Sequence, residues 1–193
     1  MKKRKYQQKA RAEQSQVTRQ LIVEATVMLH ETLGPAKTTI KAIAEQAGVQ
    51  RLTVYRHFPD ETSLFQACSS NWLGIHPPPA VADFDEAGDS ITQTANTLLA
   101  FYRYYRQTER MWQSVYRDLE EVEALRGVMN QFESYIDAVR DELLLAWNVK
   151  AKDKKQLSLT LRHCLRFSTW RSLTNDNLSD KKMVELVMRW INI

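Results

Sequence analysis

The sequence has few residues that break helices and no long apolar stretch. Its 193 residues include five glycines and five prolines, and these fall between segments with helical periodicity. Even the apolar run Leu143 to Trp147 is far shorter than the roughly twenty residues that cross a membrane. No alternating strand pattern and no internal repeat is present. We therefore expect an all-α, soluble, cytoplasmic protein with no membrane association.

Residues that build metal and catalytic sites are also scarce. Cys68 and Cys164 lie far apart in the sequence, and no signal peptide directs them to an oxidising compartment. The four histidines lack metal-ligand spacing, neither cysteine has an adjacent base in sequence, and no glycine-rich phosphate loop occurs. We expect reduced, buried cysteines, no metal and no cofactor. An enzyme is the least favoured class.

Positive charge is concentrated at the front of the chain. Residues 1–60 contain eleven Lys or Arg and five acids, so their net charge is 11 − 5 = +6. The whole chain has a net charge of +4, which leaves 4 − 6 = −2 for the remainder. This asymmetry favours a polyanionic partner for the first part only.

Glycine and proline divide the N-terminal segment into short helices. A first helix with one apolar stripe is expected to close at Gly34-Pro35, and Gly48 interrupts the next helix pair. The stripe comprises Val17, Leu21, Ile22, Ala25, Met28 and Leu29.

A further helix is expected after Pro59, because Asp60 can cap it. Its apolar face is Leu64, Cys68 and Trp72, and Gly74 is expected to end it. The stretch His76-Pro77-Pro78-Pro79 cannot be helical and predicts a spacer between two regions.

Three helices are expected downstream of the spacer, with the middle one short and ending near Gly127. Their apolar positions are, in order, Ile91, Ala95, Leu98, Leu99, Tyr102 and Tyr105; Met111, Val115 and Leu119; and Val128, Phe132, Tyr135, Ile136, Val139, Leu143 and Trp147.

The last two expected helices are apolar on more than one side. One spans about 157–173 and the other is the final helix. Two apolar faces need two partners, and a second copy of the chain is the economical outer partner. The alternative is that both helices lie at the centre of a monomer. The predicted dimer residues are Leu159, Phe167, Trp170, Leu186 and Trp190.

The segment from Thr38 to Phe58 has the spacing of a helix-turn-helix. Ile43, Ala44 and Ala47 supply small apolar contacts, and Gly48 takes the turn. Val49 and Val54 then anchor a second helix inward. This leaves polar side chains on the face that would enter a major groove: arginine reads guanine, glutamine reads adenine, and hydroxyl groups reach phosphates.

Residues 22–65 resemble the DNA-binding domain of TetR/AcrR transcriptional regulators. The resemblance implies a three-helix domain within residues 1–60, and a linking helix plus a larger helical ligand-binding and dimerisation domain within residues 61–193. It also implies a homodimeric repressor that grips a palindromic operator and releases it when a small molecule binds. The matching pieces are Thr38-Thr39-Ile40, Ile43-Ala44, Ala47-Gly48-Val49, Thr53-Val54-Tyr55, His57-Phe58-Pro59 and Leu64-Phe65.

The resemblance also implies roles for individual residues. Base edges are assigned to Gln50, Arg51 and Leu52, and phosphates to Thr38, Thr39, Thr53, Tyr55 and His57. Glu61 departs from the family pattern, because many relatives have a lysine there and a carboxylate repels phosphate. The basic arm Lys2-Lys3-Arg4 could replace that contact, or it could be a solvated tail.

His30 is a second departure from the family pattern, since relatives commonly have an aromatic residue there. We expect it to be a plain core or boundary histidine.

In the second domain, aromatic enrichment predicts a pocket for an apolar or aromatic effector. Taken singly, an aromatic residue at helical spacing is more often a core residue than a pocket residue. The candidates are Phe101, Tyr104, Tyr105, Met111, Trp112, Tyr116, Trp147, His163 and Trp170. An effector-independent architectural DNA-binding protein is the main alternative, and activation instead of repression stays open.

Overall fold

The structure, a computed structural model, describes residues 2–79 and 89–191, with side chains from residue 6 onward. Within these ranges every regular element is a helix, which confirms the expected all-α class. Two compact units are present. We call residues up to 76 together with 113–128 the head, and residues 77–112 together with 129–193 the body. This division does not follow the expected boundary after residue 60, because the linking helix groups with the head.

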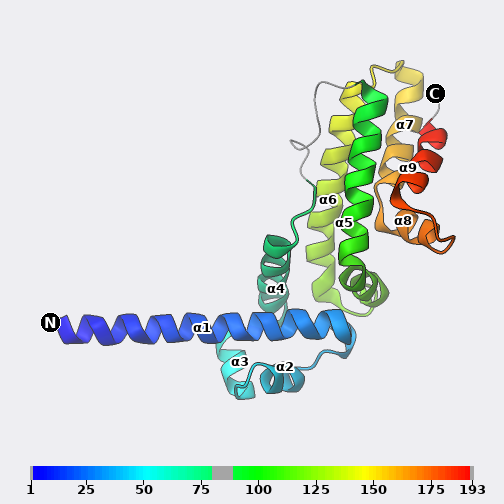
Figure 1. Cartoon of the computed structure of the whole chain (residues 1–193). Coiled ribbons are helices and arrows are strands. Elements are labelled where there is room, and N and C mark those ends of the chain that lie inside the picture. The colour runs from blue at the N-terminus through cyan, green and yellow to red at the C-terminus, as the bar shows by residue number, and fades with distance from the viewer. Residues whose placement is uncertain (1, 80–88, 192–193) are drawn as a thin grey trace. The chain divides into compact units, whose positions relative to one another are not determined.

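The head begins with an unusually long helix, α1, which spans Lys2–Thr32. The helix ends just before Gly34-Pro35, as the sequence predicts. Gly34 adopts a φ of +94°, and Pro35 starts the short 3-10 helix η1 (Pro35–Lys37). Three further helices complete this part of the head (Figure 1): α2 (Ile40–Gln46), α3 (Arg51–His57) and α4 (Glu61–Ile75).

The buried face of α1 differs from the predicted stripe. Ile22 and Ala25 are buried as expected, but Val17, Leu21 and Met28 are exposed. The true inner face includes Thr26, whose hydroxyl donates to the Ile22 carbonyl oxygen at 2.7 Å. Because this backbone carbonyl satisfies the hydroxyl, a polar residue can occupy the core. A prediction from apolar residues alone therefore places the buried face on the wrong side of α1.

The linking helix α4 continues through Gly74 to Ile75, so the predicted stop at Gly74 is wrong by one residue. Gly74 is exposed, and a helix tolerates glycine there at a modest cost in stability. The helix ends at His76 because the following prolines lack the N–H groups that would extend it.

The body contains a helix hairpin made of longer helices than the sequence predicts. Helix α5 runs without a break from Ser90 to Asp118, so the expected short helix through Met111 and Val115 is its last part. Helix α6 (Glu123–Ala146) passes through Gly127. No glycine or proline lies between Tyr105 and Asp118 to break α5, and nothing in the described structure lies within 4 Å of a Cβ built at Gly127.

The expected helix over about 157–173 is two helices, α7 (Ala151–Cys164) and α8 (Phe167–Thr174). The hydroxyls of Tyr102 and Tyr105 on α5 donate to the carbonyl oxygens of Cys164 (3.1 Å) and Leu165 (2.8 Å). These bonds satisfy carbonyls that a helix leaves free at its C-terminus. The break therefore depends on a tertiary contact, which explains why the local sequence does not show it.

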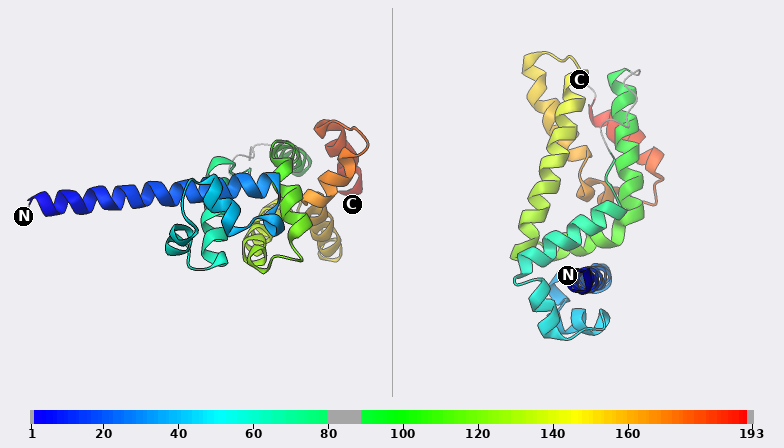
Figure 2. Two further views of the ribbon diagram at one scale, coloured as in Figure 1. Left: turned by 90° about the horizontal axis from the view of Figure 1, so that it is seen from below. Right: turned by 90° about the vertical axis from the view of Figure 1, so that its left-hand side faces the viewer.

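The chain continues into α9 (Asp180–Met188) and the short helix η3 (Arg189–Ile191), which packs on α7. Figure 2 gives two further views of these helices. Of the helices that the structure describes, none is both long and apolar enough to span a bilayer.

Candidate nucleic-acid interface

Local signals fix the helix-turn-helix of the head. The Thr39 side chain caps α2 by accepting from the backbone N–H of Ala42 at 3.1 Å. Gly48 takes a φ of +67°, a left-handed conformation that favours glycine. Val54 is fully buried and Val49 packs partly buried against the same core, as predicted. The inner side of α3 is thus held by apolar contacts.

The predicted base-reading residues lie on the opposite, exposed side. Gln50 is the N-cap residue of α3, and Arg51 follows as its first residue. Leu52 is 74% exposed, so this apolar side chain does not contribute to the core of the head. All three side chains are exposed at the start of α3.

The predicted phosphate-binding residues flank this surface. Tyr55 is exposed, Thr53 and His57 are half-buried, and Thr38 donates its hydroxyl to the Gly34 carbonyl oxygen at 2.8 Å. Arg56 is a cation that sequence reasoning left out. Its guanidinium lies 3.5 Å from the Thr53 hydroxyl oxygen, and the three-residue spacing on a helix is the signal that could have found it.

The basic arm has a defined backbone, although the side chains of Lys2, Lys3 and Arg4 lie outside the described residues. Helix α1 begins at Lys2, and the side chains from Tyr6 to Val17 are exposed. Within the head, this half of α1 extends past α2, α3 and α4 (Figure 1). Glu61 is exposed in the first turn of α4, where a carboxylate is favoured by the helix dipole.

An acidic side chain ties the α5–α6 turn to the loop after α1 within the head. Asp118 is buried, and it accepts from the Ala36 N–H at 3.0 Å and from Arg117 Nε at 2.6 Å. Arg117 also donates to the Leu33 carbonyl oxygen at 3.1 Å. The hydrogen bond from Arg117 is the main cause that holds the pKa of Asp118 below its ordinary value. Gly34 has a φ of +94°, which strains any residue with a Cβ, and a Cβ there would also overlap the Arg117 guanidinium.

His30 is a buried head residue, as the sequence predicts. It is 6% exposed, and its ring lies 4.8 Å from that of Phe65. Burial lowers the pKa of His30 to about 4, against a smaller opposing effect from Asp118. The imidazole is therefore neutral near pH 7.

Aromatic rings from three helices meet in the body. Tyr105 lies at the centre of this aromatic cluster, with ring-centroid distances of 5.5 Å to Phe167 and 6.1 Å to Trp112. Trp112 in turn lies 4.3 Å from Phe132. The cluster comprises Phe101, Tyr104, Tyr105, Trp112, Phe132, Tyr135, Phe167 and Trp170.

The cluster includes only part of the predicted effector pocket. Trp147 lies outside the cluster, because its indole N–H donates to the Thr94 hydroxyl on α5. Thr94 precedes Trp112 by 18 residues on the same helix, which corresponds to roughly 27 Å along the helix axis. Tyr116 belongs to the head, and His163 is exposed on α7. Met111, which precedes Trp112 in the sequence, is buried. Phe132, Tyr135 and Phe167 also belong to the cluster, which the sequence did not indicate because no spacing rule connects residues on different helices.

The predicted dimer surface needs a correction at two positions. Phe167 is 3% exposed and Trp170 is fully buried inside the body, so neither is available to a partner. Their apolar side faces α5 rather than the outside. Leu159 and Trp190 are exposed, and Leu186 is half-buried. Trp190 lies 6.3 Å from His163 between ring centroids.

Comparison with known proteins finds a family match within the head. The family model of bacterial regulatory proteins, tetR family, matches residues 22–68, which run from α1 to α4. Residues 22–68 are therefore similar to the DNA-binding domain of the tetR family. It is a family of DNA-binding regulators rather than enzymes. The regulator TtgR of Pseudomonas putida is 44% identical over 74 residues, which cover 38% of this chain and 35% of TtgR. The match thus spans about a third of that relative.

Solved structures of TetR-type proteins resemble nearly the whole chain. A TetR-like transcriptional regulator from Rhodococcus sp. RHA1 has a TM-score of 0.64 at 17% identity, covering 89% of this chain and 91% of the other. The TetR-like regulator LfrR from Mycobacterium smegmatis, in complex with proflavine, has a TM-score of 0.50 at 15% identity, with 91% and 94% covered. At these identities the likeness establishes the TetR fold.

Proposed function

We propose that this chain is a cytoplasmic transcriptional repressor of the TetR family that binds a palindromic operator through α3 and releases it when an effector binds. The single observation that carries the proposal is the two-sided character of α3. Val54 is fully buried, while Arg51 and Leu52 project from the surface with no packing role in the head. A short helix anchored in this way can enter a major groove.

The DNA-binding part of the proposal is tested by replacing Arg51, a predicted base-contacting residue, and Arg126, an arginine with no predicted contact to DNA. Arg51→Ala should reduce the preference for the operator over a mismatched duplex by about 1–3 kcal/mol, because a bidentate base contact is lost. Arg126→Ala is the matched control, since Arg126 is an exposed head residue in the α5–α6 hairpin. An equal loss on both duplexes would show that Arg51 only contacts phosphate. Binding measured by fluorescence anisotropy distinguishes these results.

Homodimerisation is part of the proposal, because a palindrome needs two copies of α3 about 34–36 Å apart. The surface that supports it is formed by Leu159, Trp190 and the half-buried Leu186. Sedimentation should give a dimer at micromolar concentration, and Trp190→Lys should shift it toward monomer. Leu145→Lys, on an exposed residue outside this surface, should leave the dimer intact. A wild-type monomer would exclude this mode of operator binding.

The proposed effector is a small planar aromatic molecule that inserts into the aromatic cluster of the body. Rings from three helices offer edge and face contacts to such a ligand. The fold relative LfrR binds proflavine, which makes proflavine a reasonable probe. Without DNA present, proflavine should quench Trp112 fluorescence, and Trp112→Phe should remove most of the quench. Trp147→Phe is the control because Trp147 lies outside the cluster. The opposite pattern would place the effector elsewhere.

A further inference from the structure

The head contains a cavity that the DNA-binding role does not require. It has a volume of about 300 Å³ and lies among α1, the segment that enters α2, α3 and the start of α4. Small-molecule sites usually measure about 300–1,000 Å³. This cavity is at the lower end of that range, so it suits a ligand with a single ring.

The walls of the cavity are largely aromatic and apolar. Phe58 and Phe65 are buried and line its inner part, and Leu64 adds an aliphatic wall. Tyr55, which is 54% exposed, lies where the cavity meets the surface. A flat ring can pack against such side chains with edge or face contacts.

His30 provides a buried polar group in this wall. Its ring packs on Phe65, and only 6% of the residue is exposed. Because burial lowers its pKa to about 4, the imidazole is neutral at pH 7 and has one nitrogen that accepts a hydrogen bond. A ligand with an N–H group can satisfy that acceptor, whereas a purely apolar ligand cannot.

The charges around the cavity select the sign of the ligand. Asp60 and Glu61 both line it and both are exposed. Among the described residues, its lining includes no lysine or arginine. The carboxylates attract a cation and repel an anion. Aromatic faces also attract a cation, and one face of Phe58 already holds the Arg19 guanidinium, 4.8 Å from the ring centroid.

We propose that this head cavity binds a small aromatic cation, that an N–H group of the cation donates to His30, and that occupancy weakens DNA binding. The last part rests on the function proposed above. Thr38 and Tyr55 line the cavity and are also expected to contact phosphates, so a ligand that displaces them changes the DNA surface directly.

Binding is tested on the full-length protein with three molecules of nearly equal shape: benzamidine (cation), benzamide (neutral) and benzoate (anion). The imidazole resonances of isotope-labelled protein are followed by NMR, and His30→Phe assigns the His30 signal. Benzamidine should shift this signal saturably, benzamide should bind more weakly, and benzoate should have no effect. The exposed His163 should not respond. Equal binding of benzoate, or no saturable shift of His30 with benzamidine, would overturn the proposal.

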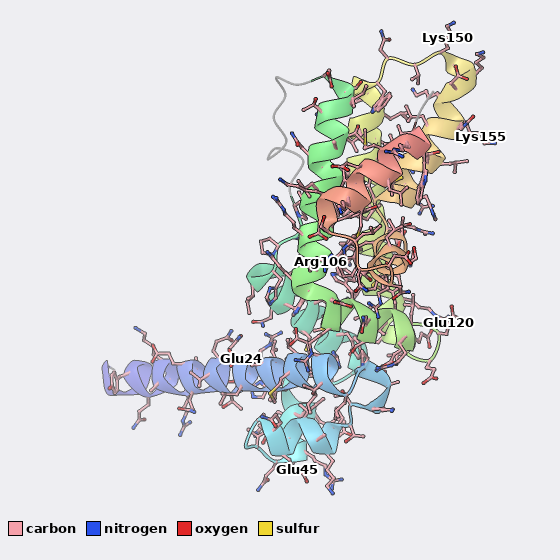
Figure 3. All side chains as sticks on the ribbon, turned by 45° about the vertical axis from the view of Figure 1, so that its right-hand side comes forward. Glu24, Glu45, Arg106, Glu120, Lys150 and Lys155 are labelled. Carbon is pink, nitrogen blue, oxygen red and sulfur yellow. The ribbon has the colours of Figure 1, made fainter. Side chains whose placement is uncertain are left out.

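The charge argument is tested with one carboxylate and a matched control. Glu61→Gln should weaken benzamidine by about two- to fivefold, the usual size of an exposed charge interaction, and leave benzamide unchanged. Glu120→Gln removes another exposed carboxylate, in the turn between α5 and α6 (Figure 3). Glu120 is not part of the cavity lining, so this change should affect neither ligand. The charge argument fails if Glu61→Gln affects both ligands equally.

The regulatory part is tested by anisotropy on a duplex from the protein's own promoter. Benzamidine should lower the affinity of the wild type, and His30→Phe should abolish that decrease. If benzamidine saturates His30 without changing the DNA affinity, the cavity is a binding site and the regulatory part is wrong. If the protein binds no duplex at all, the function proposed above fails while the NMR result on the cavity still stands.

Discussion

Two helix ends of this chain, one in the head and one in the body, are determined in different ways. In the head, the Asp60 carboxylate accepts from the N–H of Ser63, three residues away, at 2.7 Å, and Gly48 turns the chain with its own left-handed φ. In the body, α7 ends where Tyr102 and Tyr105 donate to carbonyls 62 and 60 residues away. Local signals thus set the turn before α3 and the start of α4, whereas long-range contacts mark the end of α7.

This difference explains why the family is visible in one region only. The tetR family model matches residues 22–68, which all belong to the head, while the structural relatives share the whole fold at 15–17% identity. Short local signals need particular residue types at particular positions. Tertiary contacts between helices can be made by many combinations of side chains, so the sequence of the body is free to diverge.

Core packing in the body should give the largest effect. Leu161→Ala removes a fully buried side chain of α7 and should lower the free energy of unfolding by about 2–5 kcal/mol. Leu145→Ala makes the same chemical change at a residue that is 75% exposed, and its effect should stay within about 0.5 kcal/mol. Urea denaturation followed by circular dichroism measures both. Similar losses would contradict the assignment of Leu161 to the core.

A buried titratable group in the head should give the next largest effect. The pKa of His30 is about 4 in the folded head and near 6.5 when unfolded, so between these values the unfolded state binds more protons. Stability is full above pH 6.5 and should fall by about 3 kcal/mol as the pH drops toward 4. His30→Phe should remove this part of the pH dependence. Denaturation curves of both proteins across this pH range give the difference, and parallel curves would contradict it.

The tertiary cap of α7 can be removed without changing ring packing. Tyr105→Phe leaves the Leu165 carbonyl oxygen without the hydroxyl that donates to it at 2.8 Å. An unsatisfied buried polar group costs about 1–3 kcal/mol. Hydrogen exchange should also speed up near the α7–α8 break. Tyr6→Phe is the control, since Tyr6 is 75% exposed on α1 and should behave like the wild type. If the two variants are equally stable, the cap does not hold the break.

A local cap in the head should give the smallest effect. Asp60→Ala removes the side chain that accepts from Ser63 and should destabilise α4 by about 1 kcal/mol. Asp60→Asn retains a capping oxygen and should recover most of the loss. Thermal unfolding measures both variants. An alanine variant as stable as wild type would show that tertiary packing also fixes the start of α4, and the contrast between head and body would weaken.

The helix-turn-helix was the most predictable part of the molecule. Gly48 and Val54 occupy the turn and the core as the sequence indicates. The buried side of α1 was not predictable, because Thr26 is satisfied by a backbone carbonyl and therefore replaces an apolar residue. The prediction that Trp170 lies on the dimer surface was wrong, because Trp170 is fully buried in the body. The prediction that Trp147 and Trp112 line one pocket was also wrong, because Trp147 contacts Thr94, far along α5 from Trp112. The spacing of residues along one helix does not show which other helix a side chain will contact.

The sequence by itself determined the helical class, the DNA-binding motif and the positive front half, because each depends on residues close together in the chain. Only the tertiary structure decided where α5 and α7 end, which aromatic rings meet around Tyr105, and that His30 lines a cavity. These features depend on side chains brought together from distant helices. Their free energy comes from burial and from hydrogen bonds that exist only after the chain has folded.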